Sequence, residues 1–229
     1  YLFRYTSAGD NQQAWDKDKA DYWCPLDYYV GGDHAVAHLL YFRFWTKFFA
    51  DHGYLGFSEP VKRLLYNGYI NAPDGLKMSK SKGNVIDPLD VIDSGYGADT
   101  LRTYEMFIGP YELDAIWNTG GIGGVYRFLN RCWSLVQEYL EAKSADKLVK
   151  LDKTTQLELL RTEHATIKKV TEDIYGAQFN TAVSTLMEHL NNLTKLKTAG
   201  FDRRLWQAVL SSLCQLLAPF APHVASELY

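Results

Sequence analysis

Four successive apolar stripes in the second half of the chain restrict its fold most strongly. From Val125 onward, apolar residues recur every three or four positions, as they do on the buried face of an amphipathic helix. The connections between these stripes are of modest length, so we expect neighbouring helices to run antiparallel. The stripes lie at residues 125–140, 157–174, 182–196 and 205–217. The sequence therefore predicts an antiparallel helical bundle over residues 119–229, truncated at its C-terminal end.

Residues 1–118 follow a different rhythm. Apolar runs predict strands at residues 1–5, 26–30 and 68–71, and a short helix is expected at 62–65. Residues 33–51 predict a helix that is apolar on all faces and is therefore buried. Asp87-Pro88 predicts a helix N-terminus, and a second helix is expected over residues 100–108. Strand, buried helix and strand predict an α/β region, the C-terminal half of a parallel sheet, with the domain boundary near residues 118–124.

Composition excludes several classes of protein. The chain has 229 residues and a net charge of -3, which argues against a DNA coat or a polybasic membrane anchor. Cys24, Cys132 and Cys214 are scattered, which indicates reduced thiols in the cytoplasm and no cysteine-based zinc site. No apolar run reaches the length of about 18 residues that a membrane span needs, so neither spanning nor secretion is expected. Because the chain starts in a strand-like run and stops within a helical pattern, we expect both ends to be cuts in a longer protein.

A lysine-rich string follows the turn at residues 73–75. Lys77, Met78, Ser79, Lys80 and Ser81 continue into a further lysine, a glycine and an asparagine. Three lysines, two hydroxyls and a flexible backbone in one small volume suit a polyphosphate. A solvated basic loop is the alternative, and composition alone does not exclude it.

A second candidate site joins the end of a predicted strand to the start of a helix. Gly31 and Gly32 precede Asp33 and His34, where free N–H groups favour an anion and a carboxylate can bind ribose hydroxyls. Asp33 can equally be a simple helix cap. His34 and His38 have the spacing of a helical metal pair, but no third ligand is obvious, so no metal site is predicted. We expect His34 beside a nucleotide and His38 in a hydrogen-bonded interior position.

The bundle offers weaker candidates. Gly120–Gly124 lacks dinucleotide-loop spacing and predicts a flexible connection. Four basic residues on predicted helices are candidates for RNA phosphate contacts, although such residues are usually only solvated: Arg127, Arg131, Lys168 and Lys169. Four tryptophans are expected in the core: Trp45, Trp117, Trp133 and Trp206.

Taken in order, these strings resemble a known family. Lys77–Ser81 reads KMSKS, the second signature of class I aminoacyl-tRNA synthetases. The strings at 87–88, 96–102, 127–131, 179–182 and 218–223 resemble the C-terminal half of the leucine, isoleucine and valine group, over nearly the whole chain. The segment from Trp23 to Tyr41 is similar to the leucine-specific branch, with isoleucyl-, valyl- or methionyl-tRNA synthetase as the alternatives. It departs from the family in that Asp33 follows Gly32 directly, without the usual spacer and glutamate.

The resemblance implies the second half of a Rossmann-like nucleotide-binding domain followed by an anticodon-binding-type helical domain. It implies that leucine attacks the α-phosphate of ATP, with Mg²⁺ accompanying the nucleotide, and that the leucyl group then passes to tRNA. It also implies that Lys77 and Lys80 are catalytic groups. The ATP site that it implies consists of the turn at Gly31, Gly32, Asp33 and His34 together with the lysine string. A cytoplasmic monomer without DNA or membrane partners is expected.

The first family signature, His-x-Gly-His, does not occur in the chain. It is therefore expected upstream of Tyr1, together with the first half of the nucleotide fold, and the isolated chain is expected to be inactive. Two other classes stay open, a non-catalytic RNA-binding module and a metal-dependent hydrolase centred on His34 and His38.

Overall fold

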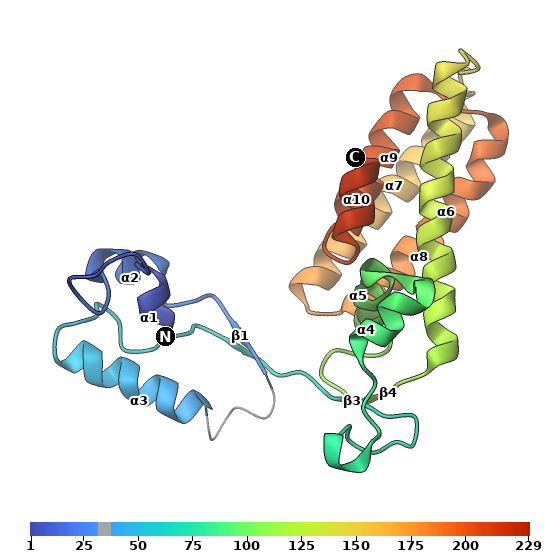
Figure 1. Ribbon diagram of the computed structural model, residues 1–229. Helices are drawn as coiled ribbons and strands as arrows, with labels where there is room; N and C mark the ends of the chain where they lie inside the picture. The colour runs from blue at the N-terminus through green and yellow to red at the C-terminus, as the bar shows by residue number, and fades with distance from the viewer. Residues whose placement is uncertain (32–37) are drawn as a thin grey trace. The chain divides into compact units, whose positions relative to one another are not determined.

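The structure, a computed structural model, describes residues 1–31 and 38–229. These residues form two compact units, Tyr1–Gly68 and Tyr69–Tyr229 (Figure 1). Each unit has its own buried core. The first is built around Phe3, Ala20, Cys24 and Leu55, whereas the second contains a large cluster within its helices and a smaller one beside its short strands.

In the first unit, two short helices precede a strand–helix–strand segment. The helices are α1 (Leu2–Tyr5) and α2 (Lys17–Trp23), and the segment comprises β1 (Tyr29–Val30), α3 (described from His38 to Asp51) and β2 (Leu64–Leu65). Strands β1 and β2 are parallel, with Tyr29 opposite Leu64 and Val30 opposite Leu65. Two parallel strands joined through a helix form a crossover unit of the kind that the sequence predicts. Its second strand, however, is β2 and not the predicted strand at residues 68–71, which pairs within the second unit.

Two predictions for this unit are wrong. The predicted strand at residues 1–5 is helix α1, in which Phe3 turns into an aromatic cluster with Trp15 and Phe57. The predicted helix at 62–65 contains strand β2, because the backbone there pairs with β1. In both places tertiary contacts override a local preference that a run of four or five residues specifies only weakly.

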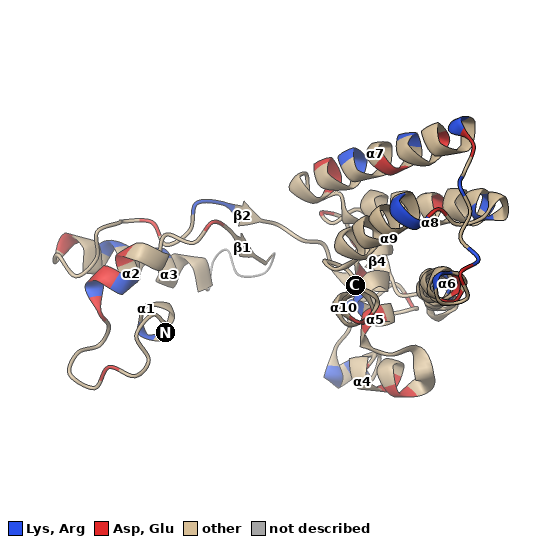
Figure 2. Cartoon of the chain, turned by 90° about the horizontal axis from the view of Figure 1, so that it is seen from above, with Lys and Arg blue, Asp and Glu red and all other residues tan. Residues whose placement is uncertain are grey.

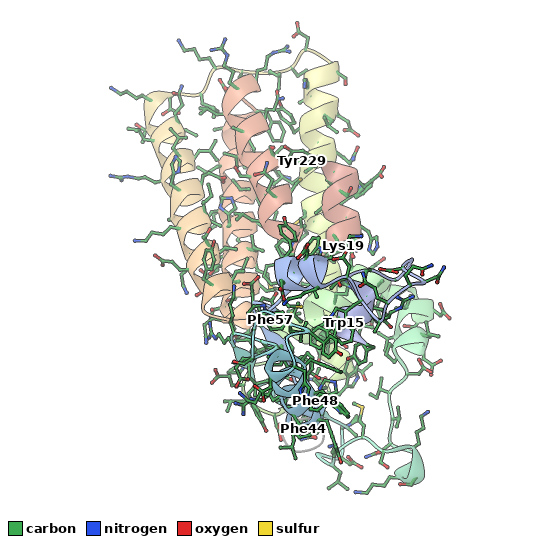
Figure 3. All side chains as sticks on the ribbon, turned by 90° about the vertical axis from the view of Figure 1, so that its left-hand side faces the viewer. Trp15, Lys19, Phe44, Phe48, Phe57 and Tyr229 are labelled. Atoms are coloured by element: carbon green, nitrogen blue, oxygen red, sulfur yellow. The ribbon has the colours of Figure 1, made fainter. Side chains whose placement is uncertain are left out.

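Helix α3 is the largest departure from expectation. Its sequence predicts burial on all faces, yet Thr46 is the only buried residue among its described positions. Trp45, expected in the core, is 48% exposed, and Phe44 and Phe48 project from the same helix (Figure 3). One side of α3 does pack, because the Phe49 ring lies 4.8 Å from the Trp15 ring.

The second unit begins with a parallel strand pair around short helices. Its elements are β3 (Ile70–Asn71), η1 (Lys80–Lys82), α4 (Pro88–Val91), η2 (Ile92–Tyr96), α5 (Ala98–Phe107) and β4 (Ala115–Ile116). Ile70 pairs with Ala115 and Asn71 with Ile116. The Asp87 carboxylate accepts a hydrogen bond from Leu89 N, 2.8 Å away, and Pro88 starts α4, which confirms the predicted helix start.

The rest of the second unit is helical, as the apolar stripes predict. Helices α6 (Thr119–Ser144), α7 (Lys153–Tyr175), α8 (Phe179–Leu196) and α9 (Arg203–Leu217) run alternately up and down, and η3 (Lys197–Ala199) and α10 (Pro222–Leu228) complete the unit (Figure 1). Asp152 and Asp202 cap α7 and α9 with their side chains. None of the described helices is long and apolar enough to cross a membrane.

The glycine-rich stretch at residues 120–124 is helical and not the flexible connection that its composition predicts. Asn118 Oδ1 accepts a hydrogen bond from Gly120 N and starts α6. A Cβ atom at Gly121 would lie 3.0 Å from the Tyr104 ring, so glycine lets α6 approach α5 closely. Tertiary packing therefore compensates the poor helix propensity of glycine.

Candidate functional site

A tight turn after β3 leads into the lysine loop, which we define as residues 76–84. Gly75 N donates to Ala72 O, and Leu76 N donates to Asp74 Oδ1 at 2.9 Å. The backbone of Gly83 has φ 68°, the left-handed conformation that glycine adopts without strain. These hydrogen bonds and the turn at Gly83 reverse the direction of the chain, so both ends of the loop lie close together.

Asn84 closes the loop. Its Oδ1 accepts a hydrogen bond from Ser79 N at 2.9 Å, and its Nδ2 donates to Asp74 Oδ2 and to Lys77 O at 3.4 Å each. One amide group therefore links the turn, the first lysine and the serine in the middle of the motif. Ser79 Oγ and Ser81 Oγ lie 2.8 Å apart, which places two hydroxyls side by side.

The lysines of the loop have different surroundings. Lys77 Nζ lies 4.2 Å from the centroid of the Tyr69 ring, within the range of a cation–π interaction. Lys80 and Lys82 lie on η1 with exposed side chains, and neither forms an ion pair with any residue that the structure describes. Lys80 thus presents a charge beside the paired hydroxyls, which is an arrangement suited to phosphate oxygens.

Met78 anchors the loop to the protein. Its side chain packs against the buried cluster that includes Leu101, Tyr104 and Trp117. The Tyr104 hydroxyl donates to Asn118 O at 2.7 Å, and burial raises the pKa of this tyrosine, so the hydroxyl stays protonated. The loop therefore rests on a well-packed base even though its three lysines are exposed residues.

The second predicted nucleotide site is described only at its start. Gly31 directly follows β1, and its N–H donates to Leu65 O at 3.2 Å. The predictions for Gly32, Asp33 and His34 lie outside the described residues. His38 stacks on the Tyr29 ring at 5.3 Å, and its Nε2 lies 3.5 Å from the Tyr1 hydroxyl. Within the described ranges, no three His, Cys, Asp or Glu side chains gather where they could hold a metal ion.

Three of the four predicted RNA-contacting residues have partners within the bundle. Arg131 Nη2 donates to Asn191 Oδ1 at 2.8 Å. Lys168 and Lys169 form ion pairs with the acidic residues four positions further along α7, a helix on which both signs of charge alternate (Figure 2). Arg127 is exposed on α6, and none of the ion pairs among the described residues includes it.

Sequence reasoning missed Tyr69 and Asp74 as parts of the site, and it placed Asn84 in the lysine string without giving it a role. Asn84 stands in the string that continues the lysine motif, so its position was a usable signal. Nothing in the sequence pairs Tyr69 with Lys77, because that contact depends on β3 running past the loop.

Two family models match the chain. One, described as tRNA synthetases class I (I, L, M and V), matches residues 14–117. The other, described as the anticodon-binding domain of tRNA ligase, matches residues 156–229. The chain belongs to the class I aminoacyl-tRNA synthetases, and its fold is part of a Rossmann-like domain followed by a helical bundle.

Within this class the chain is similar to leucine–tRNA ligases. It is 44% identical over 238 residues to that of Thermotoga petrophila and 45% identical over 231 residues to that of Dehalococcoides mccartyi. Both matches cover the whole chain and 28% and 27% of the respective relative. The chain therefore spans a little more than a quarter of the length of these curated relatives.

Solved structures agree with this assignment. A ternary complex of LeuRS, tRNA and LeuAMS from Agrobacterium radiobacter K84 matches with a TM-score of 0.89 and 33% identity, over 100% of this chain and 30% of that one. A methionyl-tRNA synthetase of Mycobacterium tuberculosis with methionyl-adenylate matches with a TM-score of 0.71 and 19% identity, over 98% of this chain and 47% of that one. The second likeness concerns the fold alone.

Proposed function

We propose that this chain is part of a leucine–tRNA ligase, in which it supplies the lysine loop of the ATP site and the start of a tRNA-binding helical domain. The loop geometry is the observation that carries the proposal: Lys80 projects beside two hydroxyls on a turn that Asn84 holds. Whole-chain identity of 44% to a leucine–tRNA ligase supports leucine as the amino acid. The proposed domains are residues 1–118 and 119–229, and the proposed protein is a cytoplasmic monomer.

The reaction proposed is attack of the leucine carboxylate on the α-phosphate of ATP, which forms leucyl-adenylate and releases pyrophosphate. The terminal hydroxyl of tRNA then takes the leucyl group from the adenylate, and AMP leaves. Displacement at phosphorus requires positioned positive charge more than it requires a covalent partner. Lys80 and Lys77 are the proposed charges, with the Ser79 and Ser81 hydroxyls as further donors. Gly31, Gly32, Asp33 and His34 are proposed at the nucleoside end, and Mg²⁺ is proposed to arrive with the triphosphate and to neutralise part of its charge.

The test is leucine-dependent ATP–pyrophosphate exchange by the protein at the full length of its relatives. Lys80→Ala is expected to lower the exchange rate by about 100-fold or more, the usual effect of removing one preorganised charge-stabilising group. Leucine affinity is expected to change little. Lys82→Ala is the matched control, because Lys82 is an exposed lysine on the same turn. An unchanged exchange rate in Lys80→Ala, or an equal loss in both variants, would refute the assignment.

A further inference from the structure

A cleft of about 420 Å³ lies between α5, α6 and the start of α10 in the second unit. This volume falls in the range of about 300–1,000 Å³ that is typical of small-molecule sites. Tyr126, Asn130 and Trp133 line it from α6, and their spacing of four and three residues puts them on one helix face. The lysine loop does not contribute to the lining.

Aromatic rings form much of the cleft surface. Tyr126 and Trp133 are 40% and 39% exposed, whereas Phe128 and Tyr139 on the same helix are buried. The Tyr96 ring packs edge-on against Tyr126, with 5.7 Å between centroids, and so fixes the orientation of that ring. The cleft therefore presents flat, oriented surfaces on which a planar ring can stack.

A histidine held by a buried carboxylate supplies the polar wall. Asp99 is buried, and its Oδ1 accepts a hydrogen bond from His223 Nδ1 at 2.7 Å while its Oδ2 accepts one from Val224 N at 2.7 Å. An ionised carboxylate only accepts, so Nδ1 carries the proton towards Asp99. The exposed imidazole therefore keeps Nε2 for a partner in the cleft, and the Asn130 amide lines the same space.

A positive charge lies at the rim. The position that a Cβ atom would take on Gly123 is 3.5 Å from Arg127 Nη1 and 3.9 Å from the Tyr96 hydroxyl. The guanidinium thus lies beside one of the aromatic walls, and the absent side chain of Gly123 leaves it room. A charge next to stacking surfaces is the combination with which proteins bind single-stranded nucleic acid.

We propose that this cleft binds one unpaired nucleotide of the tRNA, with its base against Trp133 and Tyr126 and its phosphate against Arg127. The proposal rests on the proposed function in that it takes tRNA as the partner. A paired nucleotide is stacked and hydrogen-bonded within its own helix, so only a loop, a bulge or an end offers a base that can enter. His223 and Asn130 then contact the base edge.

The first experiment separates the two steps of the reaction in the full-length protein. Trp133→Leu is expected to raise the KM for tRNA in leucine transfer by about tenfold, the usual effect of losing one stacked base. Leucine-dependent pyrophosphate exchange, measured without tRNA, stays at the wild-type rate. Trp133→Phe keeps a ring and retains most of the affinity. Tyr175→Leu, which removes an 83% exposed ring at the end of α7, is the matched control.

An unchanged KM for tRNA in Trp133→Leu, with exchange intact, overturns the cleft proposal and leaves the proposed function standing. Absence of exchange in the wild-type protein overturns the proposed function instead. A photo-crosslinking phenylalanine analogue at position 133, irradiated with unfractionated tRNA, then tests the cleft independently of any activity. Attachment to a nucleotide of a loop or end supports the proposal, whereas attachment only to paired stems or only to polypeptide overturns it.

Discussion

The buried pair of Glu163 and His189 should couple α7 to α8. Glu163 Oε2 lies 3.0 Å from His189 Nε2, and the two residues are only 4% and 1% exposed. The two helices pack against each other along the bundle. Removing one member leaves the polar group of the other in a dry core, which costs about 1–3 kcal/mol of the free energy of unfolding.

A double-mutant cycle measures this coupling. Glu163→Met and His189→Leu each keep the side-chain volume roughly and remove the polar group. Replacing both members of a buried polar pair by apolar residues of similar shape can be close to neutral, so the double variant should lose about 1–2 kcal/mol less than the sum of the single losses. Guanidinium unfolding followed by the helical circular dichroism signal gives the four free energies.

The control is the pair of Lys168 and Glu172 on α7, whose charged atoms lie 3.9 Å apart with side chains 76% and 62% exposed. Its cycle should give a coupling of about 0.5 kcal/mol or less, because solvent screens exposed pairs. Additive losses at Glu163 and His189, or equal coupling in both cycles, would refute the reasoning that burial determines the interaction energy.

Three further predictions concern the backbone, the thiols and a surface ion cluster. Gly200→Ala should lose about 2 kcal/mol or more of unfolding free energy, because Gly200 has φ 98° and its Cβ would clash with Val149 Cγ2. Gly95→Ala, at φ 99° in open space, should lose about 1 kcal/mol. Equal losses by denaturant titration would contradict the role of the clash. Cys132 should resist Ellman's reagent in the folded chain and react once guanidinium is added, since burial raises the pKa of its thiol; rapid native reaction would contradict this. Arg43, and after it Lys47, hold the pKa of the Glu59 carboxyl at about 2. The stability that this carboxylate contributes is present above its unfolded-state pKa and is lost as the pH falls towards 2. In urea titrations, Glu59→Gln should therefore cost at most about 1 kcal/mol of unfolding free energy at pH 7 and nothing near pH 2. A difference in unfolding free energy that persists at low pH would exclude the ionic origin.

The helical bundle could be predicted from the sequence because the pattern that specifies each helix occurs many times. Each helix repeats an apolar spacing over many turns, so a single unsuitable residue changes little. Asp87-Pro88 was predictable for a different reason, since capping chemistry acts within three residues. The short strands were harder to predict from the sequence. Strand β2 spans only two residues, and it is a strand because it pairs with β1, which lies on the other side of α3 in the chain.

The remaining errors come from contacts between distant parts of the chain. The helix at Gly120–Gly124 forms because α5 packs closely against it at Tyr104. Helix α3 was expected to be buried, and within the described residues its aromatic rings remain largely exposed. In the candidate site, the composition of the lysine string predicted phosphate binding, whereas the contact of Lys77 with Tyr69 could not be predicted. In the separate cleft, the Asp99–His223 pair joins residues 124 positions apart.

The order of residues in the lysine loop follows from its geometry. Three lysines within six positions repel one another and favour an extended loop unless other contacts oppose them. Gly83 takes φ 68°, which turns the chain so that Asn84 reaches back to Ser79 N, and Asn84 in turn bonds Lys77 O. A glycine followed by an asparagine after the lysines is therefore the part of the motif that holds the charges together. In the proposed function, Lys80 meets a phosphate in one orientation because Gly83 and Asn84, which carry no charge, hold the turn beneath it.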